Sequence, residues 1–452
     1  MRKPALAAVA LSLLALTACG QPSPAEPGGA APSQAATVTD ADIEKALETD
    51  TTLTFWSWVP NVDKTIALFQ QKYPKVKINL VNAGQSADEY AKLQSAIKAG
   101  SGAPDVAQIE YFALPQFALS KAVVDLNQYG AASWKDLFTD SAWAQVTVNN
   151  GVYGVPQDTG PMAMFYRKDV LDKLGLKPPA TWEEFAAAAK KIKEDDPGNF
   201  ITSVDPGDAG GVDSLIWQAG GRPFAIENAT TVRVNLQDEG TKRWAELWSG
   251  LVRDKLVDPA PGWNDAWWQG MASGKYALWM AGAWAPGAIE STIPQTQGKW
   301  RAAPMPQWDA SAPVNAENGG SSVAVLAQSK NALAAVGFAK WLNSDPDAVR
   351  SLNTASGLFP ATKELLNSPD FLDAKLPLLG DQQANKIFAE GSAQVGKGWQ
   401  YLPFQVYANS VFKDTVGQAI AGNGDIAGGL SSWQQQITTY GGQQGFTLAA
   451  GS

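Results

Sequence analysis

The sequence lacks histidine altogether and has one cysteine, Cys19, among its 452 residues. Without histidine the chain cannot form a His-based catalytic triad or a His-ligated metal site, and it has no imidazole to act as a general base. With a single cysteine it cannot form an intrachain disulfide. We therefore expect neither a metal nor a cofactor.

Catalytic and nucleotide-binding motifs are scarce as well. Neither G-x-S-x-G nor G-x-G-x-x-G occurs in the sequence. Residues 391–398, GSAQVGKG, fit G-x-x-x-x-G-K, but Gly398 stands where a P-loop needs Ser or Thr for magnesium. We therefore predict that the chain is not an enzyme, although a glycosidase that uses two carboxylates stays open because Asp and Glu are abundant.

Positive charge is the third shortage. The chain has 35 Lys and Arg against 44 Asp and Glu, which gives a formal net charge of −9. No basic stripe is available to displace counterions from phosphates, so we exclude a nucleic-acid partner. An acidic surface suits a protein that works among neutral or cationic small molecules.

The N-terminus has the parts of a bacterial export signal. Arg2 and Lys3 precede an apolar stretch over residues 5–16, which is too short to span a bilayer. The segment LTAC, ending at Cys19, resembles the lipobox of bacterial lipoproteins, in which cleavage precedes a cysteine that becomes diacylated. We predict a signal peptide over residues 1–18 and a lipid on Cys19 that attaches the protein to the outer face of the cell membrane. The alternative is an ordinary signal peptide followed by a free or buried thiol.

A linker is expected after Cys19. The predicted linker, residues 19–45, continues after Cys19 with GQPSPAEPGGAAPSQAAT, which is rich in Pro, Gly, Ala and Ser and has almost no apolar bulk. Such a segment cannot bury enough surface to offset the entropy lost on ordering, so we predict a flexible spacer. No later segment has enough uninterrupted apolar residues for a transmembrane helix.

Beyond the linker, the apolar residues alternate between the period of a strand and that of a helix. Ser86 and Glu89 have the spacing of a capping box, and Gly100 is placed to end the same helix. The strand–helix–strand–helix–strand order implies a mostly parallel sheet covered by helices, with ligand contacts at the carboxyl ends of strands. The expected strands are residues 52–58, 76–81 and 104–110, and the expected helices are 62–74 and 86–100.

A second block of helical sequence follows residue 160. Thr181 and Glu184 again have capping-box spacing. Trp244 and Trp248 share one face of an amphipathic helix, and we assign them to the core because such a pair needs no ligand.

Tryptophan is the feature that the sequence has in excess, with 18 residues. Many stand beside Gly, Pro, Asn or Asp, as in GWNDAWWQG, MAGAWAPG and GKGWQYLPF. A pyranose has an apolar C–H face and a rim of hydroxyls, which aromatic platforms and nearby carboxylates or amides can match. Any one of these residues could equally be core, and the set as a whole favours a sugar ligand.

Four segments occur in order along the chain: GVYGVPQDTGPMAMFYRKDVLDKLGL followed by TWEEF, then LIWQAGGRPF, MASGKYALWMAGAWAPG and NGGSSVAVLAQSKNALAAVGFAKWL. Together they resemble the family 1 extracellular solute-binding proteins, the lipoprotein receptors of ABC sugar importers, with a distant similarity to maltose-binding protein. The resemblance runs from about Thr52 to the C-terminus. It implies an α/β, two-lobe periplasmic-binding-protein-like (type II) fold, with discontinuous lobes joined by a hinge and the ligand between them.

The resemblance also implies where the lobes divide. Lobe 1 would take residues 46–159 plus 308–355, and lobe 2 would take 160–307 plus 356–452. The chain would cross between lobes near residues 157–160, 305–308 and 356–357. Gly160 and Gly357 would suit crossings that must absorb backbone rotation.

The same resemblance implies the ligand-binding residues. Trp284 matches the tryptophan that stacks on sugar in the family, and Glu110 and Asp158 would bridge neighbouring sugar hydroxyls. For Asp158, a turn residue that caps its own backbone is the alternative. Trp399 would close one end of the cleft. The full set is Trp56, Trp58, Glu110, Tyr111, Asp158, Trp263, Trp284, Gly320, Ser321 and Trp399.

The implied function is capture of a sugar or oligosaccharide and its delivery to the membrane permease of an ABC importer, by a protein that we expect to be a monomer. A secreted carbohydrate-active enzyme and a receptor for peptides or cationic solutes are the alternatives. The chain departs from its relatives in the loop PGDAGGVDS, residues 206–214, which carries Asp208 and Asp213 where relatives often have aromatics.

Overall fold

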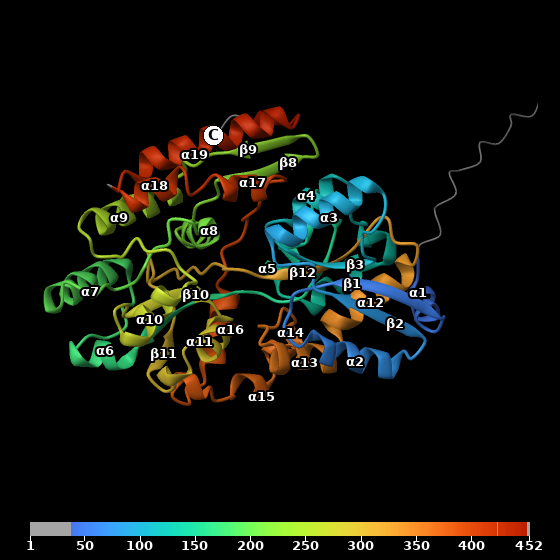
Figure 1. Ribbon diagram of the computed structural model, residues 1–452, viewed down its shortest axis with the longest axis horizontal. Helices are drawn as coiled ribbons and strands as arrows, with labels where there is room; N and C mark the ends of the chain where they lie inside the picture. The colour runs from blue at the N-terminus through green and yellow to red at the C-terminus, as the bar shows by residue number, and fades with distance from the viewer. Residues whose placement is uncertain (1–37, 423, 450–452) are drawn as a thin grey trace, which may run out of the picture. The chain divides into compact units, whose positions relative to one another are not determined.

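The computed structural model describes residues 38–422 and 424–449 (Figure 1). The predicted signal peptide, the lipid on Cys19 and the linker up to residue 37 lie outside this part of the chain. Within it, no helix is both long and apolar enough to cross a bilayer.

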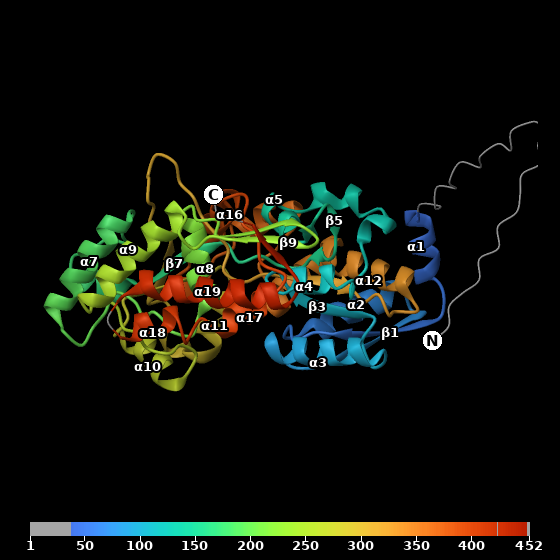
Figure 2. The same cartoon turned by 90° about the horizontal axis from the view of Figure 1, so that it is seen from above.

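Helix α1 (Asp40–Leu47) occupies the end of the predicted linker, so the prediction of a spacer up to residue 45 is wrong from residue 40 onward. Thr39 and Asp42 form a capping box at its start. Ile43 and Leu47 are buried against α12 (Ala332–Ser344), where Gly337 leaves room for their methyl groups. The two helices lie side by side in both views (Figures 1 and 2).

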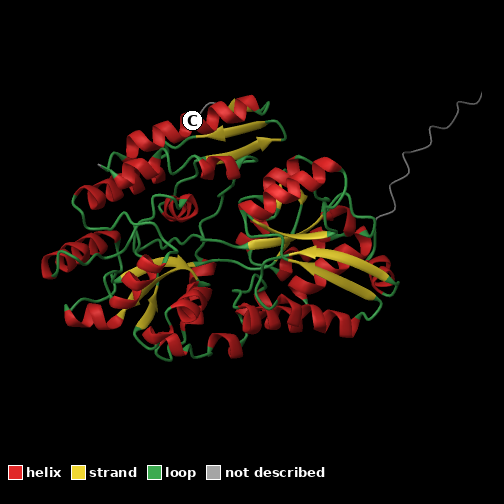
Figure 3. Ribbon diagram, in the orientation of Figure 1, coloured by secondary structure: helices red, strands yellow, loops and turns green. Residues whose placement is uncertain are grey.

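The first core surrounds a five-stranded sheet with strand order β2-β1-β3-β12-β6. Strand β1 pairs in parallel with β2 and β3, as the expected strand–helix alternation requires, and β12 joins from far along the chain in antiparallel register. Helices flank this sheet (Figure 3). The strands are β1 (Thr51–Trp56), β2 (Val76–Val81), β3 (Val106–Glu110), β6 (Val155–Pro156) and β12 (Ser321–Val325), and the first helices are α2 (Val62–Lys72), α3 (Ala87–Ala99), α4 (Leu114–Leu119) and α5 (Asp140–Gln145).

The start of α3 differs from the prediction. Ser86 has a φ of 49° and its side chain makes no capping hydrogen bond, so the predicted capping box with Glu89 is wrong. The Ser86 side chain instead lies close to the Glu110 carboxylate, where it lowers the pKa of that group against the effect of burial. The predicted stop is confirmed, since Gly100 ends α3 in the left-handed conformation with a φ of 68°.

The remaining helices and two three-stranded sheets build a second and a third core. Thr181 caps α7 (Trp182–Asp195) by accepting the N–H of Glu184. Trp244 and Trp248 on α9 (Glu239–Arg253) are fully buried, which confirms their assignment to the core. The two sheets are β10-β7-β11 and β13-β9-β8. Their strands are β7 (Met162–Arg167), β8 (Phe224–Asn228), β9 (Thr231–Val234), β10 (Leu278–Gly282), β11 (Trp300–Ala303) and β13 (Thr447–Ala449).

The helices of these two cores are α6 (Lys168–Lys173), α7 (Trp182–Asp195), α8 (Ala209–Gln218), α9 (Glu239–Arg253), α10 (Asp265–Ser273), α11 (Ala285–Thr292), α13 (Pro346–Ser356), α14 (Lys363–Leu366), α15 (Pro369–Leu372), α16 (Ala384–Ala393), α17 (Gln405–Ser410), α18 (Val416–Ala421) and α19 (Ile426–Gln443). Among them, α13 contributes side chains to both the first and the third core.

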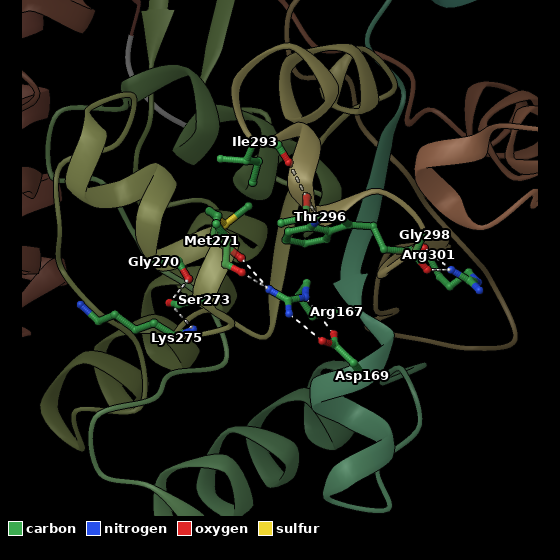
Figure 4. Close-up of polar contacts among 12 residues, drawn as sticks. Arg167, Asp169, Gly270, Met271, Ser273, Lys275, Ile293, Thr296, Gly298 and Arg301 are labelled. Carbon is green, nitrogen blue, oxygen red and sulfur yellow. Dashed lines mark hydrogen bonds and ion pairs between the residues drawn. The ribbon is translucent and has the colours of Figure 1, made fainter.

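Arg167 fixes one end of α10 to β7 (Figure 4). Its side chain is 3% exposed and donates from Nη1 to the carbonyl oxygens of Met271 and Ala272, at 3.0 and 2.7 Å. Its Nε and Nη2 donate to the carboxylate of Asp169 at 2.8 and 2.6 Å. A bidentate pair of this kind is geometrically specific and fixes the guanidinium. Its bonds to Met271 and Ala272 therefore hold α10 in one position relative to the sheet.

Three extended segments cross between the first core and the other two. The backbone N–H of Gln157 donates to the carbonyl of Ser321, that of Asn318 to Gly160, and that of Thr159 to Phe359. The crossing expected near residues 305–308 is not among them, because Met305 and Trp308 pack with the second core. The exact division into lobes stays a prediction.

Candidate functional site

Two tryptophans stand at the carboxyl end of β1. Trp56 is the last residue of the strand and Trp58 follows two residues later, and both are half-buried against the first core. Ser57 between them is buried, with its hydroxyl donating to Gln108 at 2.8 Å. The ring of Trp58 meets that of Tyr90 edge-on, with the ring centroids 6.2 Å apart. This part of the predicted site therefore presents partly exposed aromatic surface.

Glu110 ends β3 next to these rings. Its carboxylate accepts the hydroxyl of Tyr90 at 3.0 Å, and its backbone N–H donates to the same hydroxyl oxygen at 2.8 Å. Burial raises the pKa of Glu110 above its usual range. The neighbouring Glu89 is fully buried, neither of its carboxyl oxygens has a hydrogen-bond partner, and burial together with the charge of Glu110 raises its pKa to about 8.

Four predicted residues meet at the crossings. The carboxylate of Asp158 accepts the backbone N–H of Ser321 at 2.8 Å, and the Tyr111 hydroxyl donates to the Asp158 carbonyl at 2.8 Å. The carbonyl of Gly320 accepts the N–H of Tyr111. The N–H of Ser321 is thus used within the protein and is not free for a ligand. The carboxylate of Asp158 joins two crossings, and its role in bridging sugar hydroxyls stays a prediction.

Two further carboxyl groups, Glu317 and Asp213, belong to this region and were not among the predicted site residues. Glu317 lies on a crossing, accepts the Ser141 hydroxyl at 2.7 Å and has its other oxygen without a partner. Asp213 on α8 accepts the side-chain amide of Gln405 at 3.1 Å, and its second oxygen is also unpartnered. Burial raises the pKa of Glu317 to about 7 and that of Asp213 well above its usual value.

The charges of these carboxyl groups affect one another's pKa values, and none of the groups has a cationic partner. Glu110 and Glu317 both raise the pKa of Asp158, after burial, to about 7. No Lys or Arg in residues 38–422 and 424–449 forms an ion pair with any of them. A group of this kind can accept hydrogen bonds from hydroxyls or from a cation. The carboxyl groups are Glu89, Glu110, Asp158, Asp213 and Glu317.

These buried carboxyl groups predict that the stability of the folded protein depends on pH. The folded protein holds the proton of Asp158 up to about pH 7, whereas an unfolded Asp releases it near pH 3.8, so the stability that Asp158 contributes is fully present below about pH 3.8 and is lost as the pH rises to its folded pKa of about 7. We expect the free energy of unfolding to fall between pH 5 and pH 7, with Asp158 contributing roughly 2 kcal/mol. Urea denaturation of the wild type and of Asp158→Asn measures this, and equal pH slopes would contradict it.

Five tryptophans gather beside the crossings. Trp284, at the start of α11, is half-buried and its Nε1 donates to the carbonyl of Asn318 at 2.7 Å. The ring of Trp263 lies 5.7 Å from that of Trp284 at an interplanar angle of 30°. The remaining members pack behind these two and are Trp267, Trp268 and Trp279. The predicted residues Trp263 and Trp284 therefore form one aromatic surface.

Trp399 is packed in the second core. It is 4% exposed and its ring stacks on that of Trp217, with centroids 5.2 Å apart and planes 6° from parallel. It also lines a pocket together with Tyr111 of the first core, and its role in closing one end of the cleft stays a prediction. Tyr401 contacts the first core as well, because its ring meets that of Phe112 at 6.5 Å.

Comparison with known proteins gives both a family and solved relatives. The protein-family model for "bacterial extracellular solute-binding protein" matches residues 64–377 of the sequence. The lactose-binding protein of Rhizobium radiobacter is 28% identical over 365 residues, which cover 76% of this chain and 82% of that protein.

Two solved structures resemble the chain over most of its length. One is the ABC transporter associated binding protein from B. animalis subsp. lactis Bl-04, in complex with β-1,6-galactobiose, at 38% identity and a TM-score of 0.78, covering 89% of this chain and all of that one. The other is the galacto-N-biose-/lacto-N-biose I-binding protein from Bifidobacterium longum, in complex with lacto-N-biose, at 27% identity and a TM-score of 0.77, covering 88% and 98%.

Proposed function

The chain belongs to the bacterial extracellular solute-binding proteins, and from this premise we propose that it captures a sugar or short oligosaccharide between two lobes and delivers it to the permease of an ABC importer. The family and the two-lobe α/β fold predicted from the sequence are thereby confirmed. The relatives are binding proteins of transporters, which confirms that the chain is not an enzyme and sets aside the carbohydrate-active alternative.

The observation that carries the proposal is the combination of unpaired carboxyl groups with a tryptophan surface. Sugar hydroxyls can donate to Glu110, Glu317 and Asp213, whose remaining oxygens have no cation to neutralise them. The rings of Trp263 and Trp284 offer flat apolar faces of the kind that pack against pyranose C–H groups. Orientation by a few polar groups and packing on aromatics is the usual arrangement in small-molecule sites.

The relatives suggest which sugars to examine first. Their bound or named ligands are lactose, β-1,6-galactobiose and lacto-N-biose, all of which are disaccharides that contain galactose. We therefore propose a galactose-containing disaccharide as the ligand of this chain.

Capture would proceed by a population shift. Aromatic and carboxyl groups stand on both sides of the crossings, Trp58 and Glu110 with the first core and Trp263 with the third, so a ligand that touches both sides stabilises the closed form. The family places the protein outside the cytoplasm. We further propose that the lipid on Cys19 attaches it to the membrane and that it works as a monomer.

The proposal is tested by thermal unfolding of the protein made from Gly20 onward, against galactose-containing and glucose-containing disaccharides. A ligand at 100 times its dissociation constant adds about 2.7 kcal/mol to the free energy of unfolding, which is an easily measured shift. A short arginine-containing peptide serves as the control, because the uncompensated carboxyl groups could also accept a cation. Stabilisation by the peptide and by no sugar would overturn the proposal and support a receptor for cationic solutes.

A further inference from the structure

An open pocket lies beside Trp263, which is one of its lining residues. Its apolar lining includes Val212, Leu215 and Met280, together with tryptophans of the five-membered group. Asp208, from the loop that departs from the family pattern, and Asp205, which directly precedes that loop, also line the pocket. An apolar pocket with a few convergent polar groups is the usual form of a ligand site.

Trp263 is held in an unusual position at this pocket. It is 58% exposed, the only tryptophan of the described residues among the exposed large hydrophobic side chains, and its backbone has a φ of 62°. A bulky residue in the left-handed region costs free energy and persists only where surrounding contacts fix it. The contacts here are a hydrogen bond from the N–H of Gly262 to the Asp205 carboxylate, 2.8 Å, and the cap that Asn264 gives to α10.

The rim has hydrogen-bonding capacity left over. Each carboxylate, Asp205 and Asp208, accepts backbone N–H groups that fix its orientation, and a carboxylate has about four acceptor positions. The hydroxyl of Ser203 accepts Trp267 Nε1 at 2.7 Å, so its own proton is free to be donated. The pocket can thus both accept from and donate to the hydroxyl rim of a sugar ring.

We propose that this pocket is the subsite for the second ring of a disaccharide, with the first ring lying against Trp284 on the side of the crossings. This inference rests on the proposed sugar-binding function and adds to it the feature that determines the length of the sugar that binds. Trp263 lies between the two positions, because its ring is 5.7 Å from Trp284 and 5.9 Å from Trp267. The carboxylates of Asp205 and of Asp208, which belongs to the loop over residues 206–214, therefore shape the site, while the aromatic surface comes from Trp263. A monosaccharide fills the first position only.

The test is calorimetric titration of the wild type, Trp263→Ala and Trp263→Phe with β-1,6-galactobiose and with galactose. We expect Trp263→Ala to lose about 30-fold in affinity for the disaccharide and less than about twofold for galactose, in line with truncation of an aromatic anchor. Trp263→Phe should recover part of the disaccharide affinity because it restores a ring. Leu137→Ala is the matched control, since Leu137 is 43% exposed and lies outside the pocket, and it should leave both affinities unchanged.

A second measurement reports on the position of the ligand and does not depend on affinity. Acrylamide should quench Trp263 in the free protein, and saturating disaccharide should protect it where saturating galactose does not. Equal losses for both sugars in Trp263→Ala, or no loss for either, would overturn the inference. A wild-type protein that binds neither these sugars nor any other disaccharide would overturn the proposed function itself.

Discussion

Replacing Trp284 with alanine is expected to weaken sugar binding by about 2–4 kcal/mol, a loss of roughly 30- to 900-fold. Its ring lies beside Trp263 and against Trp279, half-buried next to the crossings, where both sides of the proposed cleft meet. Truncating a half-buried aromatic anchor removes its packing on the ligand, which in most interfaces costs more than the loss of a rim contact. Titration with the preferred disaccharide measures the effect.

Trp284→Phe separates stacking from support of the crossing. Phenylalanine keeps a ring but cannot donate the Nε1 hydrogen bond that reaches Asn318 at 2.7 Å. If stacking dominates, Trp284→Phe should retain most of the affinity that Trp284→Ala loses. Wild-type affinity in Trp284→Ala would remove Trp284 from the binding site.

Local sequence patterns were enough to predict the elements that follow Asp50. Residues at strand spacing formed β1 and β2, and the apolar run of residues 104–110 formed β3, which is buried on both faces. The helical spacing of residues 62–74 formed α2, because it buries Val62, Ile66 and Phe69 on one face against the first core. Gly100 ended α3 as predicted because only a short residue takes the left-handed conformation without cost.

Where the prediction failed, a contact from a distant segment was decisive. Ser86 has a φ of 49° instead of the extended backbone of a capping residue, and its side chain lies close to the Glu110 carboxylate from β3. The end of the linker became α1 because α12, some 290 residues later, offers Gly337 as a surface for Ile43 and Leu47. Neither partner could be read from neighbouring residues.

In the candidate site, too, local sequence predicted some residues, and contacts between distant segments decided the others. The excess of tryptophan beside turn residues pointed to Trp263 and Trp284, which do form one surface. Trp399 has the same sequence context but stacks on Trp217, so context alone does not separate surface from core. Glu317 was not predicted because the contact that places it in this region is with Ser141, which lies 176 residues earlier in the sequence. The Ser141 hydroxyl and the Glu317 carboxylate come within 2.7 Å only in the folded chain.

Gly160→Ala is expected to destabilise the protein by about 3 kcal/mol or more, since a side chain forced into a filled space costs roughly 1–3 kcal/mol before any lost hydrogen bond is added. The φ of Gly160 is not positive, so its backbone conformation alone does not require glycine there. A Cβ atom would lie 2.1 Å from the carbonyl oxygen of Asn318 on the neighbouring crossing. Neither backbone can yield without breaking the Asn318–Gly160 hydrogen bond of 2.7 Å.

The same displacement would reach the proposed binding site, because the carbonyl that it pushes aside is the acceptor of Trp284 Nε1. Gly160→Ala should therefore lower both the free energy of unfolding and the affinity for sugar, whereas Trp284→Phe should leave stability closer to that of the wild type. Gly287→Ala on α11 is the matched control: nothing lies within 4 Å of its added Cβ, and alanine in a helix favours stability by roughly 0.5–1 kcal/mol. Urea denaturation of the three variants measures these differences in the free energy of unfolding. A Gly160→Ala protein as stable as the wild type would show that the crossings can separate without cost. Closure of the lobes would then not depend on the contact between the crossings.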